Sequence, residues 1–227
     1  MTPDQFLRDT AQKPAAPAYL FLGPEDFQRR KCRKALVAKV LGEEGVESSG
    51  FSHHDLDQTS LVEVLDDARA MSLFATDRLI WVTSAEAVLP KRASKDDADL
   101  PAAKELASYL KDPTPGVTVI FDCRRYTFEG DDKARIEKVS NFYAPVKTKV
   151  EFYPLEPEAA RALAQQLIKD AGLKIGLPEL ALLLEACDHD ALRLANEIEK
   201  LSLFAGKNAV TPADLESLVP NARSTTI

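Results

Sequence analysis

Short apolar runs alternate with helical segments along most of the chain, and this alternation ends near residue 152. Most of these runs are continuous rather than alternating in polarity, which is typical of parallel strands covered by helices on both faces. Strands of this kind separated by helices indicate an α/β domain with a parallel sheet. The five predicted strands are 19–22, a weakly patterned stretch at 46–54, 79–82, 117–121 and 149–152.

From Pro157 onward the sequence shows only helical periods. Thr211 followed by Pro212 is typical of a helix cap and its first turn, and glycines separate the other segments. The boundary falls in the proline-flanked linker 153–157, so we predict an α/β domain at 1–153 and a helical domain at 154–227. The predicted helices of the second domain are 158–171, 178–187, 190–204 and 211–218.

The charge balance excludes some classes of partner. The chain has 36 Asp and Glu against 29 Lys and Arg, a net charge of −7. Such a chain is neither a general nucleic-acid coat nor a polybasic membrane binder. It has no apolar run of membrane-spanning length and no signal pattern at its start, so we expect a cytoplasmic protein with no membrane contact. Its three cysteines form no CxxC pair, which argues against a disulfide framework or zinc knuckle.

A nucleotide-binding α/β domain places its phosphate loop directly after the first strand. The sequence there is Gly23-Pro24-Glu25-Asp26. A P-loop needs a second glycine followed by Lys and Ser or Thr, and none of these is in place. Pro24 lacks an N–H donor, while Glu25 and Asp26 bring negative charge to the place of the phosphates. We therefore predict a degenerate phosphate loop and no cofactor.

Other candidates for catalysis are weak. Asp122 after the fourth strand is either a metal or catalytic carboxylate or a structural group that caps a turn or pairs with Arg124 or Arg125. His53 and His54 point to opposite faces of an extended segment and cannot easily share a metal. We assign no catalytic residue and no metal ligand.

A second conspicuous feature lies before the third strand. Met71-Ser72-Leu73-Phe74 continues the helical pattern that is predicted for 61–70. Adjacent Leu and Phe cannot both point into one helix–sheet interface. Either the segment is a loop tucked against the core, or Leu73 and Phe74 project as an anchor for a pocket on a partner protein.

The helix after the first strand carries a basic cluster, with two interpretations. A solvated helix face explains it, and so do phosphate contacts with DNA, which would weaken steeply with salt. The residues we single out for DNA contact are Arg29, Arg30 and Lys34.

Three motifs in this order resemble the delta subunit of bacterial DNA polymerase III, a subunit of the clamp loader. They are YLFLGPEDF at 19–27, AMSLFA at 70–75 and NEIEKL at 196–201. The resemblance implies an AAA+-like fold, with a five-stranded parallel sheet domain followed by a small all-α lid domain. It also implies a third, C-terminal collar domain. The sequence ends at Ile227, soon after the last predicted helix, so we expect the collar to be absent.

The same resemblance implies a non-catalytic subunit that binds the sliding clamp (the beta subunit) and opens or holds open its ring without hydrolysing ATP. Its clamp-binding residues here would be Met71, Leu73 and Phe74. Its other partners would be the gamma/tau and delta prime loader subunits, reached through the collar. Two other functions remain open on the residues themselves: a nucleic-acid-binding regulator that uses the basic helix, and an atypical nucleotide-dependent enzyme.

Overall fold

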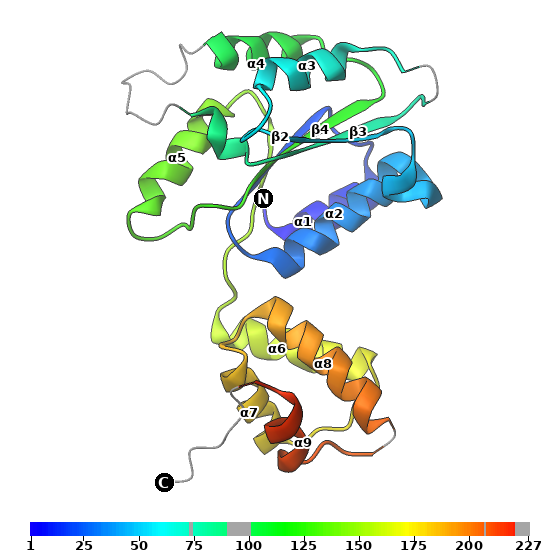
Figure 1. The fold of residues 1–227 in the computed structure, drawn as a ribbon, viewed down its shortest axis with the longest axis vertical. Helices are drawn as coiled ribbons and strands as arrows, with labels where there is room; N and C mark the ends of the chain where they lie inside the picture. The colour runs from blue at the N-terminus through cyan, green and yellow to red at the C-terminus, as the bar shows by residue number, and fades with distance from the viewer. Residues whose placement is uncertain (73–74, 90–100, 207, 221–227) are drawn as a thin grey trace. The chain divides into compact units, whose positions relative to one another are not determined.

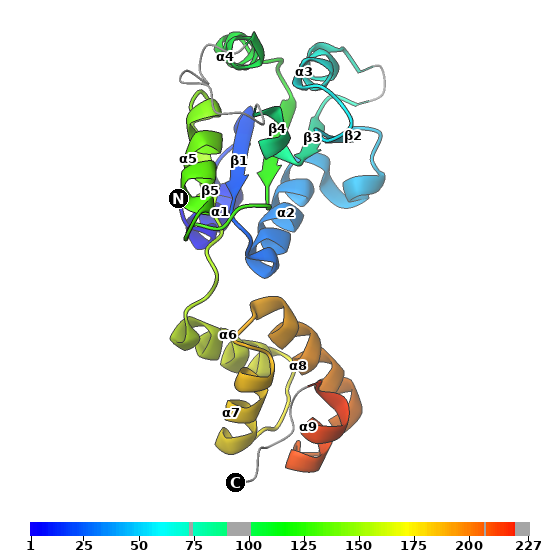
Figure 2. The same ribbon diagram turned by 60° about the vertical axis from the view of Figure 1, so that its left-hand side comes forward.

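The computed structural model describes residues 1–72, 75–89, 101–206 and 208–220. The chain divides into two compact units, the first of Met1–Pro24 and Gln28–Tyr153 and the second of Glu25–Phe27 and Pro154–Ile227. We call them the α/β unit and the helical unit. Figures 1 and 2 show the elements of each.

The α/β unit contains a sheet of five parallel strands in the order β2-β3-β4-β1-β5. The prediction of an α/β fold with a five-stranded parallel sheet is therefore confirmed. The strands are β1 (Ala18–Leu22), β2 (Phe51–Asp55), β3 (Arg78–Thr83), β4 (Val117–Cys123) and β5 (Thr148–Glu151). β1 lies between β4 and β5, with Tyr19 opposite Ile120 on one side and Thr148 on the other.

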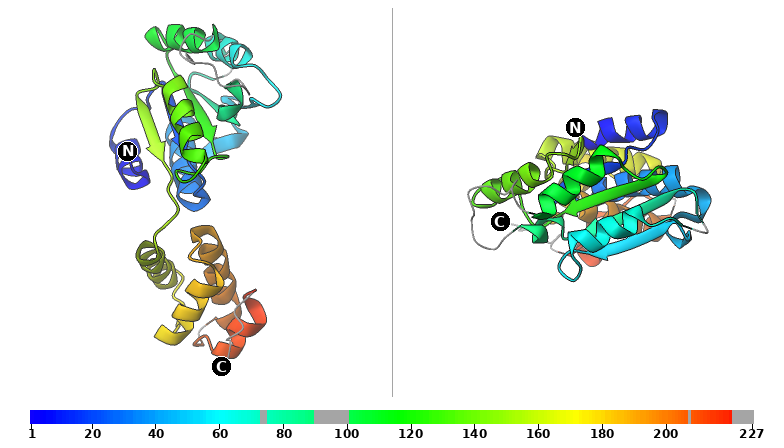
Figure 3. Two further views of the ribbon diagram at one scale, coloured as in Figure 1. Left: turned by 90° about the vertical axis from the view of Figure 1, so that its left-hand side faces the viewer. Right: turned by 90° about the horizontal axis from the view of Figure 1, so that it is seen from above.

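Helices cover both faces of this sheet, as Figures 1 and 3 show. One face carries α1 (Pro3–Gln12) and α2 (Asp26–Leu41). The other carries α3 (Leu61–Arg69), α4 (Pro101–Lys111) and α5 (Asp132–Phe142). Short 3-10 segments follow α2 at Gly42–Glu47 and β3 at Ala85–Val88.

Two hydrophobic clusters fill the space between the sheet and its helices. Successive side chains of a strand point to opposite faces. Tyr19 and Phe21 of β1 accordingly pack with Leu36 of α2, while Leu20 and Leu22 pack in the cluster of α3, α4 and α5. All five residues of β1 are buried, which explains why its sequence is a continuous apolar run.

The helix α1 was not predicted from the sequence. Thr2 caps it by accepting a hydrogen bond from the N–H of Gln5, and Pro3 occupies its first turn. Phe6 is 1% exposed, and its ring meets those of Tyr19 and Phe21 edge-on at centroid distances of 5.4 Å. α1 therefore covers part of the sheet face on which α2 also packs.

The helical unit is built from α6 (Pro157–Asp170), α7 (Leu177–Ala186), α8 (Ala191–Ala205) and α9 (Pro212–Leu218). These bounds match the predicted helices to within a residue or two. Its core includes Leu183, Ile198 and Leu201. Lys200 forms an ion pair with Glu197 within α8. No helix in the described part of the chain is long and apolar enough to cross a membrane.

Candidate functional site

The predicted docking residues lie in the connection between α3 and β3. Met71 is 90% exposed. Leu73 and Phe74 lie outside the described residues. The expectation that the helix continues through this segment is wrong at its start, because α3 ends at Arg69 and Ala70 has extended backbone angles (φ −67°, ψ 133°). Met71 therefore lies beyond the end of the helix.

The start of α3 is fixed by its own sequence. The Ser60 hydroxyl accepts from the N–H of Glu63, and the Glu63 carboxylate accepts from the N–H of Ser60 at 2.9 Å. This is a capping box, and it satisfies two backbone donors. Leu61, Val64 and Leu65 then bury the inner face of the helix.

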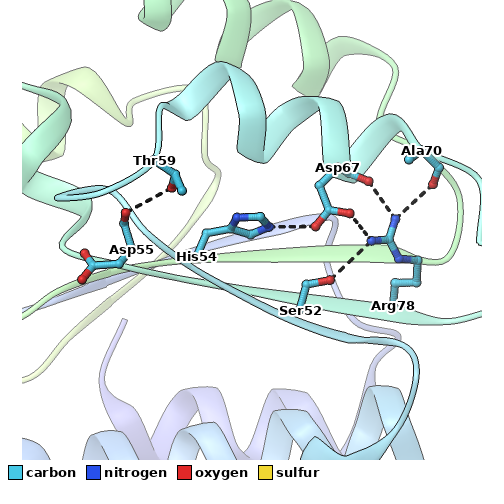
Figure 4. Close-up of polar contacts among 7 residues, drawn as sticks. All are labelled: Ser52, His54, Asp55, Thr59, Asp67, Ala70 and Arg78. Carbon is cyan, nitrogen blue, oxygen red and sulfur yellow. Dashed lines mark hydrogen bonds and ion pairs between the residues drawn. The ribbon is translucent and has the colours of Figure 1, made fainter.

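The end of α3 is held by side chains from two strands, which Figure 4 shows. Arg78, the first residue of β3, donates from Nη1 to the carbonyl oxygens of Asp67 at 2.7 Å and Ala70 at 3.0 Å. Its Nη2 pairs with the Asp67 carboxylate and reaches Ser52 Oγ of β2 at 3.4 Å. His54 Nε2 lies 2.8 Å from the other Asp67 oxygen. We call Ser52, His54, Asp67 and Arg78 the α3 anchor.

The charges of the α3 anchor complement one another and the end of the helix. Partial burial raises the pKa of Asp67, but hydrogen bonds from His54 and Arg78 lower it by more, so the pKa lies below its ordinary value. Asp67 is therefore an ionised acceptor at neutral pH. The positive Arg78 faces the last carbonyls of α3, where the helix dipole favours a cation.

The turn after β1 is occupied by protein groups. Arg29 of α2 is 1% exposed, forms an ion pair with Asp122 of β4 and donates from Nη2 to the carbonyl oxygen of Gly23. Its guanidinium carbon lies 4.5 Å from the centre of the Phe152 ring. Both terminal nitrogens of Arg29 are thus engaged inside the α/β unit.

Gly23 itself sits in a position that suits only glycine. Its φ of +105° is strained for residues with a side chain. A Cβ atom there would also collide with the Phe128 ring and the carbonyl oxygen of Phe152. The turn is therefore closely packed by its own unit.

These contacts correct one prediction about the basic helix. Arg29 does not belong to a solvated face, because its guanidinium is paired with Asp122, so it is unsuited to contact DNA. Arg30 and Lys34 are exposed, as a surface role requires. The Arg33 guanidinium lies 4.6 Å from the centre of the Trp81 ring.

Asp122 behaves as a structural carboxylate. Besides Arg29, it accepts from Arg124 Nε at 3.0 Å, which confirms one of the pairings that the sequence suggests. Arg125 instead pairs with Asp57 at 2.7 Å and with Glu86 at 3.1 Å. Within the described ranges, no cluster of three His, Cys, Asp or Glu side chains could hold a metal ion.

Residues 19–138 match the family model described as DNA polymerase III, delta subunit. The match extends over more than half of the chain. The chain belongs to this family. The resemblance noted from the three motifs is thereby confirmed.

Solved structures share the fold of this delta-family chain. The DNA clamp loader delta protein of Bacillus subtilis has a TM-score of 0.62 at 19% identity over 96% of this chain, which spans 62% of that protein. Domain III of the replication initiation protein DnaA from Thermotoga maritima has a TM-score of 0.51 at 13% identity, and the alignment covers 96% of this chain and 90% of that domain. A point mutant of Thermotoga maritima RuvB has a TM-score of 0.54 at 8% identity, and the alignment covers 94% of this chain and 66% of RuvB. The fold is therefore AAA+-like. A comparison with curated protein sequences found no match.

The α3 anchor of this delta-family chain was not predicted from the sequence. Arg78 follows Asp77 in a stretch that reads only as the approach to a strand. Its partners Asp67 and Ser52 lie in other elements, so no local spacing connects them. An Arg at the start of an otherwise apolar, buried strand is the one available signal, because such a charge needs a partner.

Proposed function

We propose that this chain binds the sliding clamp of the DNA polymerase and opens or holds open its ring during DNA replication. The proposal is carried by membership of the delta subunit family over residues 19–138, a range that includes the connection between α3 and β3. Met71, Leu73 and Phe74 are its clamp-binding residues, and we call 71–74 the clamp-contact segment. The 90% exposure of Met71 supports an outward-facing role for the start of this segment.

Two apolar side chains can supply much of such an attachment. Burial of a Leu or a Phe contributes about 1.5–3 kcal/mol each. Interfaces commonly concentrate their binding free energy in a few residues of this kind. The chain then favours an open ring to the extent that it binds the open state more tightly than the closed state.

In this proposal the chain does not hydrolyse ATP. The turn after β1 supports this, since Arg29 contacts the Gly23 carbonyl and is neutralised by Asp122. Pro24 supplies no N–H, and Glu25 and Asp26 add negative charge where phosphates would approach. The energy for the loading cycle would come from sister subunits.

The proposed partners follow from the family. They are the clamp and the gamma/tau and delta prime subunits, with the loader subunits reached through the family's collar domain, while residues 154–227 form the lid. The protein would act in the bacterial cytoplasm at the replisome.

DNA contact remains part of the proposal through Arg30 and Lys34. Arg30→Ala with Lys34→Ala should then reduce the slope of log affinity against log salt by about two, and an unchanged slope would remove DNA contact at this helix.

Surface plasmon resonance with immobilised clamp tests the main proposal. The sequence offers a matched control, because Ser-Leu-Phe-Ala occurs both at 72–75 and at 202–205, where Leu203 is 80% and Phe204 60% exposed. We expect Leu73→Ala with Phe74→Ala to weaken clamp binding by at least about a hundredfold. Leu203→Ala with Phe204→Ala should change it by less than about twofold. Equal affinities for wild type and the first double variant would contradict the proposal.

A further inference from the structure

We propose that Arg78 is a positioning residue for the clamp-contact segment, and that Asp67 assists it by holding the guanidinium in place. The inference rests on the proposed function, because it assigns to the α3 anchor the task of presenting residues 71–74. Neither residue contacts the clamp in this account. They act on the backbone from which the segment departs.

The first support is where the hydrogen bonds of Arg78 go. Its Nη1 reaches the carbonyl oxygen of Ala70, the residue immediately before the segment, at 3.0 Å. Its own backbone N–H donates to the carbonyl oxygen of Gly116 at 2.8 Å, at the start of β4. A single residue therefore holds the end of the connection at Ala70 with its side chain and the end at β3 with its backbone.

The second support is the way α3 ends. The last carbonyls of a helix lack partners within the helix, and a glycine in left-handed conformation often resolves this. Here Ala70 stands at the cap in an extended conformation. Arg78 supplies the donors instead, to the carbonyls of Asp67 and Ala70. The direction in which the chain leaves α3 thus depends on this side chain.

The third support is that the guanidinium is itself fixed. The Asp67 carboxylate pairs with Arg78 Nη2 on one oxygen and lies 2.8 Å from His54 Nε2 on the other. Ser52 Oγ adds a contact from β2 at 3.4 Å. Arg78 is 8% exposed, so these protein contacts replace its water. The planar fork of arginine serves several acceptors at fixed angles, whereas the ammonium of lysine is a point charge.

Holding the departure point has a consequence for binding. A segment that departs from a fixed backbone position loses less conformational freedom when it docks than one whose departure point moves, so its affinity is higher. Arg78 should therefore raise clamp affinity only through the residues of the segment. An effect of this kind is smaller when those residues are removed.

A double-mutant cycle tests this. Arg78→Lys should weaken clamp binding about tenfold in the wild-type background, equivalent to about 1.4 kcal/mol. In a Leu73→Ala background the same change should cost less than about threefold. Arg135→Lys is the matched control, since Arg135 of α5 forms an exposed pair with Asp132 at 3.3 Å. Equal losses in both backgrounds, or no loss, would overturn the inference.

A second readout needs no clamp. Amide hydrogen exchange of the folded protein should become faster at residues 70–72 in Arg78→Lys and stay unchanged in α5 and in the Arg135→Lys control. Should Arg78→Lys fold poorly, Asp67→Asn removes the charge that fixes the guanidinium and should give the same local pattern with a clamp loss of about threefold. Exchange that is unchanged, or faster everywhere, would contradict positioning. If exchange becomes faster only at residues 70–72 in Arg78→Lys but the wild-type protein does not bind the clamp, the proposed function is refuted instead.

Discussion

Arg29 of α2 and Asp122 of β4 form an ion pair in the interior of the α/β unit, with exposures of 1% and 0%. The pair lies directly after β1, because Arg29 also donates to the Gly23 carbonyl. It thereby connects the turn after β1 with β4, the strand at the centre of the sheet.

The first prediction concerns the stability that this pair provides. Asp122→Asn leaves a buried guanidinium without its counter-charge, so the free energy of unfolding should fall by about 3–5 kcal/mol in urea denaturation. Arg29→Met combined with Asp122→Leu should cost less, because no charge remains buried. Asp132→Asn, at an exposed pair, should cost under about 1 kcal/mol. A loss as small for Asp122→Asn would show that the pair is not the structural element described above.

The second prediction concerns ATP. Isothermal titration of the purified chain with Mg-ATP should give no binding heat at millimolar nucleotide, because the turn after β1 is filled by Arg29 and flanked by Glu25 and Asp26. Turnover of ATP should equal that of buffer. Micromolar binding that is lost in a variant of this turn would instead favour the alternative of a nucleotide-dependent enzyme.

The third prediction concerns acid. Hydrogen bonds from His54 and Arg78 outweigh the burial of Asp67 and hold its pKa below the value of about 3.9 in an unfolded chain. The ionised carboxylate therefore contributes stability above that value, and the contribution is lost as pH falls through the lower, folded pKa. Wild type should be more stable than Asp67→Asn at pH 6, and the difference should shrink below pH 4. Urea midpoints measured from pH 3 to 7 test this, and parallel curves would count against it.

The fourth prediction concerns the thiols. Cys32, Cys123 and Cys187 are buried and form no disulfide. Burial raises the pKa of Cys123, and it raises that of Cys187 to about 11. Thiolate is the reactive form, so native protein at pH 8 should react with a thiol reagent far more slowly than protein unfolded in guanidinium. Fast labelling of any of the three in the native state would show that its site opens readily.

The sequence was most informative where strands are covered on both faces. Arg78–Thr83 and Val117–Cys123 are central strands with continuous apolar runs, and both were predicted nearly to their ends. β2 lies at the edge of the sheet and is only half-buried, so its pattern is weak. The predicted stretch 46–54 accordingly began too early, in a 3-10 segment.

Contacts between side chains that are far apart in the sequence could not be predicted. Arg29 looked like one member of a basic helix face, because its spacing does not reveal that it faces Asp122. Arg78 belongs to the same class, with acceptors in α3 and β2. The missed helix α1 is different, because Thr2, Pro3 and Asp4 already carry the cap, proline and acidic signals of a helix start.

Release of clamps from DNA tests the central claim most directly. Labelled clamps loaded on nicked circular DNA are mixed with the purified chain in the absence of ATP, and the fraction that stays with the DNA is followed in time. We predict that wild type accelerates release and that Leu73→Ala with Phe74→Ala abolishes the acceleration, while Leu203→Ala with Phe204→Ala retains it. Release at the spontaneous rate with wild type, or equal acceleration by all three proteins, would contradict the account.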